Sequence, residues 1–184
     1  EINQNSVTNT TDPFNDAERS HRYPYGIAGD QSNITNNIVT VEHQNNDGDG
    51  KAIMSFGSAE NRSIIANNDI RCIGTTDGIW GQYMDVTDNI ISGLESYAST
   101  AIGQGPSNVI TGNTITNMSH GIQVDGQSDN IIDGNTIQVN NTGINGNNAN
   151  HLTVTNNIIE TNSGTVIYTN NGVSNIKYNL LISN

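Results

Sequence analysis

Residues 110–115 have the sequence Ile-Thr-Gly-Asn-Thr-Ile, and residues 132–137 have the nearly identical sequence Ile-Asp-Gly-Asn-Thr-Ile. Both segments place one apolar residue three positions before an asparagine and another two positions after it. Self-similarity at a fixed spacing is the signature of repeat architectures. The pattern occurs eight times in the chain, centred on Asn5, Asn37, Asn68, Asn89, Asn113, Asn135, Asn157 and Asn179.

Three apolar positions accompany these asparagines. The residues three positions before them are Ile2, Ile34, Ile65, Val86, Ile110, Ile132, Val154 and Ile176. The residues two positions after them are Val7, Val39, Ile70, Ile91, Ile115, Ile137, Ile159 and Leu181. A third apolar residue precedes each asparagine from the second copy onward: Ile27, Ile53, Ile79, Ile102, Ile122, Ile144 and Val166. Successive asparagines lie 32, 31, 21, 24, 22, 22 and 22 residues apart, so the period settles at 22.

This repeat is typical of a parallel β-helix, in which one coil contains three short strands with apolar residues facing inward. The composition agrees, because the chain has 25 Ile but only 4 Leu, and β-branched residues favour strands over helices. Parallel crossover connections are almost always right-handed. We therefore predict an all-β fold, a right-handed single-stranded parallel β-helix with about eight coils of roughly 22 residues.

The aligned asparagines are predicted to form a ladder at the tight turn between two strands. Asparagine tolerates the left-handed backbone that such a turn needs, and stacked side-chain amides can hydrogen-bond to one another. Gly112, Gly134, Asn36 and Asn67, which each precede a ladder member, fit the same turn. We therefore expect the asparagine ladder to be structural rather than a ligand site.

Composition and charge exclude several classes of protein. Six cations against 18 anions leave a formal net charge of −12, which speaks against binding nucleic acid or an anionic membrane. No apolar run approaches the roughly 20 residues that a membrane-spanning helix needs. Cys72 is the single cysteine, so disulfide bonds cannot hold the fold together, and we expect this residue to be buried and inert.

Residues 1–184 are expected to form a single β-helix domain, because this length is typical of one domain. The first and last residues already fit the repeat and contain no capping helix. An uncapped coil would expose apolar side chains and unpaired strand edges. The sequence therefore predicts a piece of a longer β-helix, whose ends are covered by flanking β-helix segments or by partner chains, for example in a homotrimer.

Two segments interrupt the repeat as inserted loops, residues 10–24 and residues 42–51. Because successive coils stack, both are expected to leave the rod at one corner, and loops on a rigid scaffold often carry function. A cation can bind the carboxylate of a uronic acid, and a histidine or tyrosine can transfer a proton. We predict catalytic roles for His21, Arg22, Tyr23 and His43, and substrate binding by Arg19 and Tyr25. The alternative is that these polar loops are only solvated.

A second candidate region is the outward side of the strands that contain the third apolar position. The polar and aromatic residues expected there are Trp80, Gln82, Gln123, Asp125, Asn145 and Asn147. An exposed aromatic ring beside amides and a carboxylate can pack against a sugar ring and bind its hydroxyls. We predict substrate binding by Trp80, Gln82, Gln123 and Asp125; the alternative for Trp80 is packing beneath a loop. His120 and Tyr97 are weaker candidates further along the first corner.

Residues 45–50, Asn-Asn-Asp-Gly-Asp-Gly, are similar to the start of a calcium-binding loop, with oxygen ligands at alternate positions. The predicted ligands are Asn45, Asp47 and Asp49. The twelfth position is Phe56 rather than the required Glu, so calcium would need further ligands from a neighbouring coil. The alternative is a flexible turn without a metal.

The segments 108–115, Asn-Val-Ile-Thr-Gly-Asn-Thr-Ile, and 121–124, Gly-Ile-Gln-Val, resemble the right-handed parallel β-helix repeat of carbohydrate-active proteins. This group includes pectate-lyase-like enzymes, alginate lyases, mannuronan C5-epimerases, glycoside hydrolases and phage tailspikes. The resemblance covers nearly the whole chain. The chain contains neither an Asp-Pro-His motif of bacterial alginate epimerases nor the clustered aspartates and arginine of pectate lyases, so no family catalytic residue is carried over.

The resemblance implies an extracellular, secreted or virion-surface protein whose partner is a polysaccharide rather than nucleic acid or a membrane. The first hypothesis is a module that processes an acidic or capsular polysaccharide as a lyase, C5-epimerase or glycosidase. The second is a non-catalytic rod that binds carbohydrate or a receptor, such as a tailspike segment or an adhesin. The sequence leaves open whether the protein is an enzyme.

Overall fold

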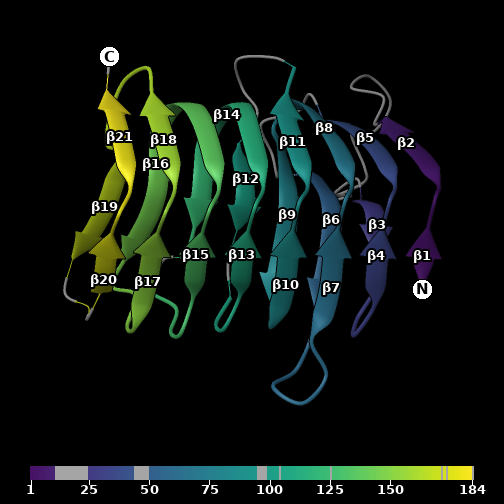
Figure 1. Cartoon of the computed structure of the whole chain (residues 1–184). Coiled ribbons are helices and arrows are strands. Elements are labelled where there is room, and N and C mark those ends of the chain that lie inside the picture. The colour runs from purple at the N-terminus through teal and green to yellow at the C-terminus, as the bar shows by residue number, and fades with distance from the viewer. Residues whose placement is uncertain are drawn as a thin grey trace, which may run out of the picture.

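The computed structural model describes residues 1–10, 25–43, 50–94, 99–103, 105–124, 126–170, 172 and 174–183. In these residues the chain forms 21 strands wound into a parallel β-helix, with the two termini at opposite ends of the rod (Figure 1). The β-helix is right-handed and has about 7 turns, which confirms the predicted fold class. The described part of the chain contains no helix of the length and apolarity that crossing a membrane requires.

The first stack of strands contains the apolar residues that lie three positions before each ladder asparagine. Its members pair in parallel in the following order: β1 (Ile2–Asn3), β4 (Asn33–Thr35), β7 (Ser63–Ala66), β10 (Met84–Thr87), β13 (Val109–Thr111), β15 (Ile131–Asp133), β17 (Leu152–Thr155) and β20 (Ser174–Lys177). The register aligns Ile110 with Val86 on one side and with Ile132 on the other. The predicted apolar positions of this row therefore stack directly on one another.

The second stack follows the ladder asparagines. Its members are β2 (Ser6–Thr10), β5 (Ile38–His43), β8 (Asp69–Gly74), β11 (Ile90–Gly93), β14 (Thr114–Gln123), β16 (Thr136–Asn147), β18 (Ile158–Thr161) and β21 (Leu180–Ser183). The register aligns Ile91 with Ile70 and with Ile115, as the repeat predicts.

The third stack closes each coil. It contains β3 (Tyr25–Ala28), β6 (Gly50–Phe56), β9 (Thr76–Gln82), β12 (Thr100–Gly103), the later halves of β14 and β16, and β19 (Ile167–Asn170). Strand β14 pairs with β11 through its first half and with β12 through its second half. The long strands β14 and β16 therefore contribute to both the second and the third stack.

One predicted position of the third row was wrong. The register pairs Ile144 with Ile167, so Ile167 rather than Val166 continues the row. In the preceding coil Ile144 follows Ile137 by seven positions, whereas Ile167 follows Ile159 by eight. The connection is one residue longer here and contains Gly164 at a φ of 103°, which shifts the strand by one position.

The three stacks enclose one continuous apolar core. Ile132, Ile137 and Ile144, from the three stacks of one coil, are each at most 1% exposed. The core also contains Cys72, which is fully buried as predicted. Each stacked isoleucine buries apolar surface against the coils on both sides, and this burial favours folding. The hydrophobic stabilisation is therefore distributed along the whole rod.

The predicted asparagine ladder is continuous from Asn5 to Asn179. Each side-chain oxygen accepts two hydrogen bonds from the preceding member: Asn113 Oδ1 accepts the backbone N–H of Asn89 at 3.0 Å and its side-chain Nδ2–H at 3.0 Å. The six inner members are at most 2% exposed: Asn37, Asn68, Asn89, Asn113, Asn135 and Asn157. Buried amides require such complete pairing, so the ladder is structural.

The left-handed backbone of the turn belongs to the residue before each ladder asparagine. These residues all have φ between 53° and 67°: Gln4, Asn36, Asn67, Asp88, Gly112, Gly134, Asn156 and Tyr178. Asn36, Asn67, Gly112 and Gly134 were expected to fit this turn, and the structure shows that they have the positive φ, whereas the ladder asparagines do not. Asn, Asp and Gly predominate at the preceding position since they tolerate positive φ best.

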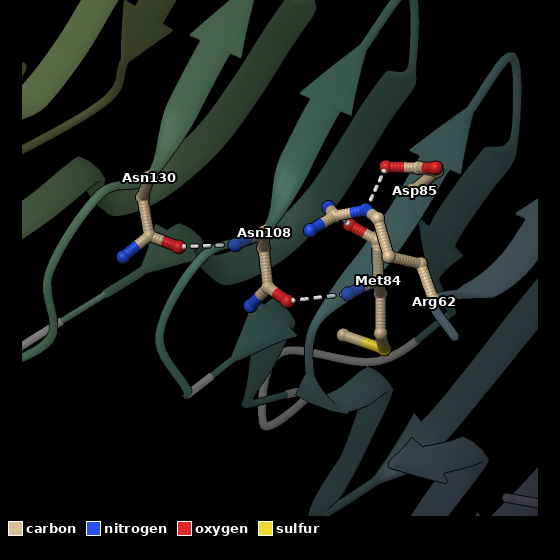
Figure 2. A network of polar contacts seen from close by, with 5 residues as sticks. All are labelled: Arg62, Met84, Asp85, Asn108 and Asn130. Atoms are coloured by element: carbon tan, nitrogen blue, oxygen red, sulfur yellow. Dashed lines mark hydrogen bonds and ion pairs between the residues drawn. The ribbon is translucent and has the colours of Figure 1, made fainter. Parts of the chain in front are cut away.

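A second, shorter set of asparagine hydrogen bonds lies where the chain enters the first stack, and the sequence analysis missed it. Asn108 Oδ1 accepts the backbone N–H of Met84 at 3.0 Å, and Asn130 Oδ1 accepts that of Asn108 at 2.9 Å (Figure 2). Next to it, Arg62 donates to the Asp85 carboxylate and to the Met84 carbonyl oxygen, both at 2.7 Å. These contacts join neighbouring coils at the start of the first stack, whereas the main ladder lies at its end.

The strands extend into both predicted insertions. Strand β5 continues through His43, and β6 begins at Gly50, so His43 and Lys51 lie on strands and not on a loop as predicted. Strand β2 ends at Thr10 and β3 begins at Tyr25. The segments 11–24 and 44–49 lie outside the described residues.

Candidate functional site

The outward side of the third stack carries two neighbouring rows of side chains. The axial row runs along the rod through Trp80, Gly103, Gln123, Asn145 and Tyr168, each paired with the next by the strand register. Before Trp80 the same register continues to Met54 and Ala28. The residues three positions before Ala28, Met54, Trp80, Gly103, Gln123 and Asn145 form the polar row, which consists of Tyr25, Lys51, Asp77, Thr100, His120 and Thr142. The winding of the chain therefore brings residues from successive coils together on one face.

Asp77 is the centre of the polar row. It is only 2% exposed, and its Oδ2 lies 2.5 Å from the Lys51 ammonium nitrogen. Its Oδ1 accepts the backbone N–H of Thr100 at 2.8 Å. A buried carboxylate is tolerated only when it is paired and hydrogen-bonded, and these two partners stabilise the buried charge of Asp77.

Lys51 links the polar row to the axial row. Its ammonium nitrogen lies 4.4 Å from the centroid of the Trp80 ring, within the range of a cation–π interaction. Its side chain is 12% exposed. Lys51 is therefore held between Asp77 and Trp80, and it restricts the orientation of the indole ring.

Gly103 provides the space that Trp80 occupies on the next coil. A Cβ atom added to Gly103 would lie 2.5 Å from both Cε3 and Cζ3 of the Trp80 ring, which is closer than real contacts allow. Only glycine permits this approach at that position. The indole ring is consequently half-buried, fixed by Lys51 and by the adjacent coil, rather than projecting freely as the alternation of the strand suggested.

His120 continues the polar row beside Thr100. Burial lowers the pKa of His120 below its ordinary value of 6.5, while the nearby negative charge of Asp77 acts in the opposite direction. The net shift is downward, so the imidazole is neutral at neutral pH. The Thr100 hydroxyl donates to Gln123 Oε1 at 3.5 Å, a long contact that connects the two rows.

The far end of the axial row is formed by Asn145 and Tyr168. Tyr168 is 43% exposed, and its hydroxyl accepts a hydrogen bond from Asn170 Nδ2 at 3.2 Å. Asn145 Oδ1 accepts the backbone N–H of Asn147 at 3.1 Å, and Asn145 is half-buried. The axial row thus has an aromatic ring near each end and two amide side chains between them.

The predicted site residues fall into three groups: those outside the described part of the chain, a buried one, and those on the expected outward face. Those that lie outside the described residues are Arg19, His21, Arg22, Tyr23, Asn45, Asp47, Asp49, Tyr97 and Asp125. His43 is 3% exposed on the inward side of β5, which does not suit the predicted catalytic role. Tyr25 is 39% exposed beside Lys51 in the register. Trp80, Gln82 and Gln123 are half-buried on the predicted outward face.

Sequence reasoning did not select Asp77, Thr100 or Tyr168. A signal for the first two existed in the repeat: the residue before each Gly-Ile or Ala-Ile pair occupies the polar row. Aligning the chain on that dipeptide gives Tyr25, Lys51, Asp77, Thr100, His120 and Thr142 directly. Tyr168 had no such signal, because the misplaced Val166 shifted the expected register of that strand.

The described residues contain no group of three or more His, Cys, Asp or Glu side chains placed to hold a metal ion. Cys72, Met84 and Met118 are fully buried in the core. Burial raises the pKa of the Cys72 thiol far above its ordinary value, and the charge of Asp77 adds to this shift. The thiol is therefore protonated and sequestered.

Comparison with known proteins gives one family. A family model with the description "Periplasmic copper-binding protein (NosD)" matches residues 31–184. The match covers 154 of the 184 residues, from 31 to 184 inclusive. No curated protein and no solved structure matches the chain significantly.

Proposed function

The chain belongs to the NosD family, described as periplasmic copper-binding proteins, and from this premise we propose that it is an exported β-helical module that binds a glycan chain on the outward face of its third stack. The observation that carries the proposal is the half-buried Trp80, which Lys51 and Gly103 hold in place beside Gln123. A fixed aromatic ring next to polar side chains is a ready binding surface for a molecule with one apolar and one polar side.

Sugar rings have both kinds of surface. Their C–H groups can pack against an aromatic face, and their hydroxyls both donate and accept hydrogen bonds. Amide side chains also donate and accept, which suits hydroxyl groups better than a purely acidic or basic surface does. Gln123 and Asn145 supply such amides directly along the rod from Trp80.

The proposed location agrees with the family description in a coarse sense, because the periplasm lies outside the cytoplasm. The narrower expectation of a virion surface stays a prediction. A glycan-binding rod outside the cytoplasm would have access to cell-surface polysaccharides.

The family description also raises the question of copper. Copper sites in proteins use imidazole, thiolate and thioether ligands that converge on the metal. Among the described residues, no three His, Cys, Asp or Glu side chains are placed together to hold a metal ion. Cys72, Met84 and Met118 are fully buried in the core, and His151 forms an exposed pair with Asp129 at 3.1 Å. The described donors do not fit a copper site, and we derive no step through copper. Calcium has no support either, because the family description names copper and the predicted ligands lie outside the described residues.

We favour glycan binding over glycan processing. Lyase and epimerase chemistry needs an accessible base that can approach the substrate. Asp77 is 2% exposed and already holds Lys51 and the Thr100 N–H, and His43 is 3% exposed. The half-buried His120 is the one described histidine on this face, and its neutral imidazole is the one described histidine side chain there that could serve as such a base. The predicted catalytic loop residues lie outside the described part of the chain, so processing remains the second candidate.

Binding to immobilised xylan, mannan, β-glucan, alginate and pectate tests the proposal. We expect at least one polysaccharide to bind the parent protein, the Trp80→Ala variant to lose most of this binding, and the Trp80→Phe variant to retain part of it. The same mixtures are followed by absorbance in the band of unsaturated uronates, where a rise would establish processing. Equal binding by the parent and Trp80→Ala would refute the proposed face, and stoichiometric stabilisation by Cu²⁺ without glycan binding would favour a metal-binding role instead.

A further inference from the structure

We propose that the ligand is a linear, uncharged glycan that lies parallel to the rod axis and extends along the axial row from Trp80 to Tyr168. This inference rests on the proposed function and adds the direction, minimum extent and charge class of the ligand. It also assigns Tyr168 as a second binding platform.

The strand register defines the track. Trp80, Gly103, Gln123, Asn145 and Tyr168 follow one another without interruption over four strand spacings, which is roughly 19 Å at the usual distance between strands. A single sugar cannot contact both aromatic rings over that distance. A chain of several linked sugars can, provided that it runs along the rod.

The sizes of the side chains favour one continuous ligand over two separate ones. Gly103 has no side chain, and Gln123 and Asn145 are half-buried, so nothing bulky in this row stands between the two aromatic rings. The two amides lie where the middle of the ligand would pass. These amides can form hydrogen bonds with sugar hydroxyl groups there, while the Trp80 and Tyr168 rings pack against the two ends of the bound segment.

The charges on this face favour an uncharged ligand. The axial row itself contains no acidic or basic side chain among its members. In the neighbouring polar row, the Lys51 ammonium is neutralised by Asp77 at 2.5 Å, and His120 is neutral at neutral pH. The chain carries a formal net charge of −12, which repels a polyanion. An acidic polysaccharide would therefore be repelled by the net charge without finding an unneutralised cation among the described residues of these two rows.

The test measures affinity against ligand length and charge by isothermal titration calorimetry. The probes are the monosaccharide, trisaccharide and hexasaccharide of each neutral glucan, xylan and mannan, together with hexamannuronate and hexagalacturonate. We expect a neutral hexasaccharide to bind at least about ten-fold more tightly than its trisaccharide, because only the longer chain contacts both platforms. Both acidic hexasaccharides should bind more weakly than the neutral one.

Three variants locate the track. Trp80→Ala and Tyr168→Ala should each weaken hexasaccharide binding by about five- to ten-fold, as expected for loss of one aromatic contact. Tyr168→Ala should leave trisaccharide binding at the Trp80 end unchanged. The matched control is Tyr178→Ala, because Tyr178 is 82% exposed at the ladder turn, away from the axial row. Circular dichroism and thermal melting verify that each variant is folded.

The possible failures are distinguishable. If Trp80→Ala weakens hexasaccharide binding as expected but Tyr168→Ala behaves like Tyr178→Ala, the axial track is refuted while the proposed function stands. Tighter binding of the acidic hexasaccharides refutes the uncharged ligand. If the parent protein binds none of the probes, both the inference and the proposed function fail.

Discussion

The ammonium nitrogen of Lys51 lies 2.5 Å from a carboxylate oxygen of Asp77, although the two residues are 26 positions apart in the chain. Their side chains are 12% and 3% exposed, so the pair is shielded from water on the face that carries Trp80. The contact forms because one coil of the β-helix separates the two residues, and their strands pair in register.

Replacing Asp77 with Asn should destabilise the protein and disturb Trp80. The Lys51 ammonium would remain largely buried without its counterion, and breaking a buried pair typically costs about 3–5 kcal/mol. Urea unfolding, followed by the fluorescence of the single Trp, measures both effects. The control is Asp85→Asn, which breaks the more exposed Arg62–Asp85 pair and should cost at most about 1 kcal/mol. Equal costs for the two variants would contradict the central role of Asp77.

Replacing Ile132 with Asp should cost several kcal/mol. Ile132 is fully buried between Ile110 and Val154, and a carboxylate there would have no polar partner. The neighbouring Ile131 is 41% exposed, so Ile131→Asp is a matched control that should have little effect. Thermal melting compares the two, and similar melting temperatures would show that the inward and outward faces of β15 have been misassigned.

Replacing Asn113 with Ala should interrupt the ladder and weaken the joint between two coils. The backbone N–H of Asn89 would lose its acceptor, and a buried unsatisfied donor costs about 1–3 kcal/mol. The Asn89 side-chain amide would lose one acceptor but keep the carbonyl oxygens of Ile65 and Thr87. Hydrogen exchange should show lost protection at the Asn89 amide first. Asn150→Ala, at an exposed asparagine, is the control. An unchanged exchange rate at the Asn89 amide would show that the ladder does not stabilise the contact between these two coils.

The stability of the protein should fall as the pH drops below about 6.5. Burial holds the pKa of His120 below its ordinary value of 6.5, so the unfolded chain binds a proton in a pH range in which the folded protein does not. The unfolded state then binds more protons, and stability declines as the pH falls from 6.5 through the folded-state pKa. Urea unfolding of the parent and of His120→Gln over this range isolates the contribution, since the variant should lack this part of the pH dependence. Parallel pH profiles for the two proteins would contradict the lowered pKa.

The candidate site could be predicted only in part. Trp80, Gln82 and Gln123 were expected on the outward side of the third row because strand alternation is a local property. The partners that fix Trp80 could not be identified in this way, because Lys51 and Gly103 belong to the coils before and after it. Lys51 was instead assigned to a loop, since the length of β6 depends on its pairing with β9.

The sequence by itself determined the coil, the ladder and the core, because a repeat specifies the same inward positions in every turn. Asn113 and Ile132 have the same roles as their equivalents in each neighbouring copy, and no knowledge of the rest of the fold was needed to see it. Tertiary structure alone decided how the connections of unequal length set the strand register and bring outward side chains of different coils together. It placed Ile167 instead of Val166 in the third row and joined Lys51 to Asp77 and Trp80. These outcomes depend on hydrogen bonds between adjacent coils, which select the register and therefore which outward side chains become neighbours.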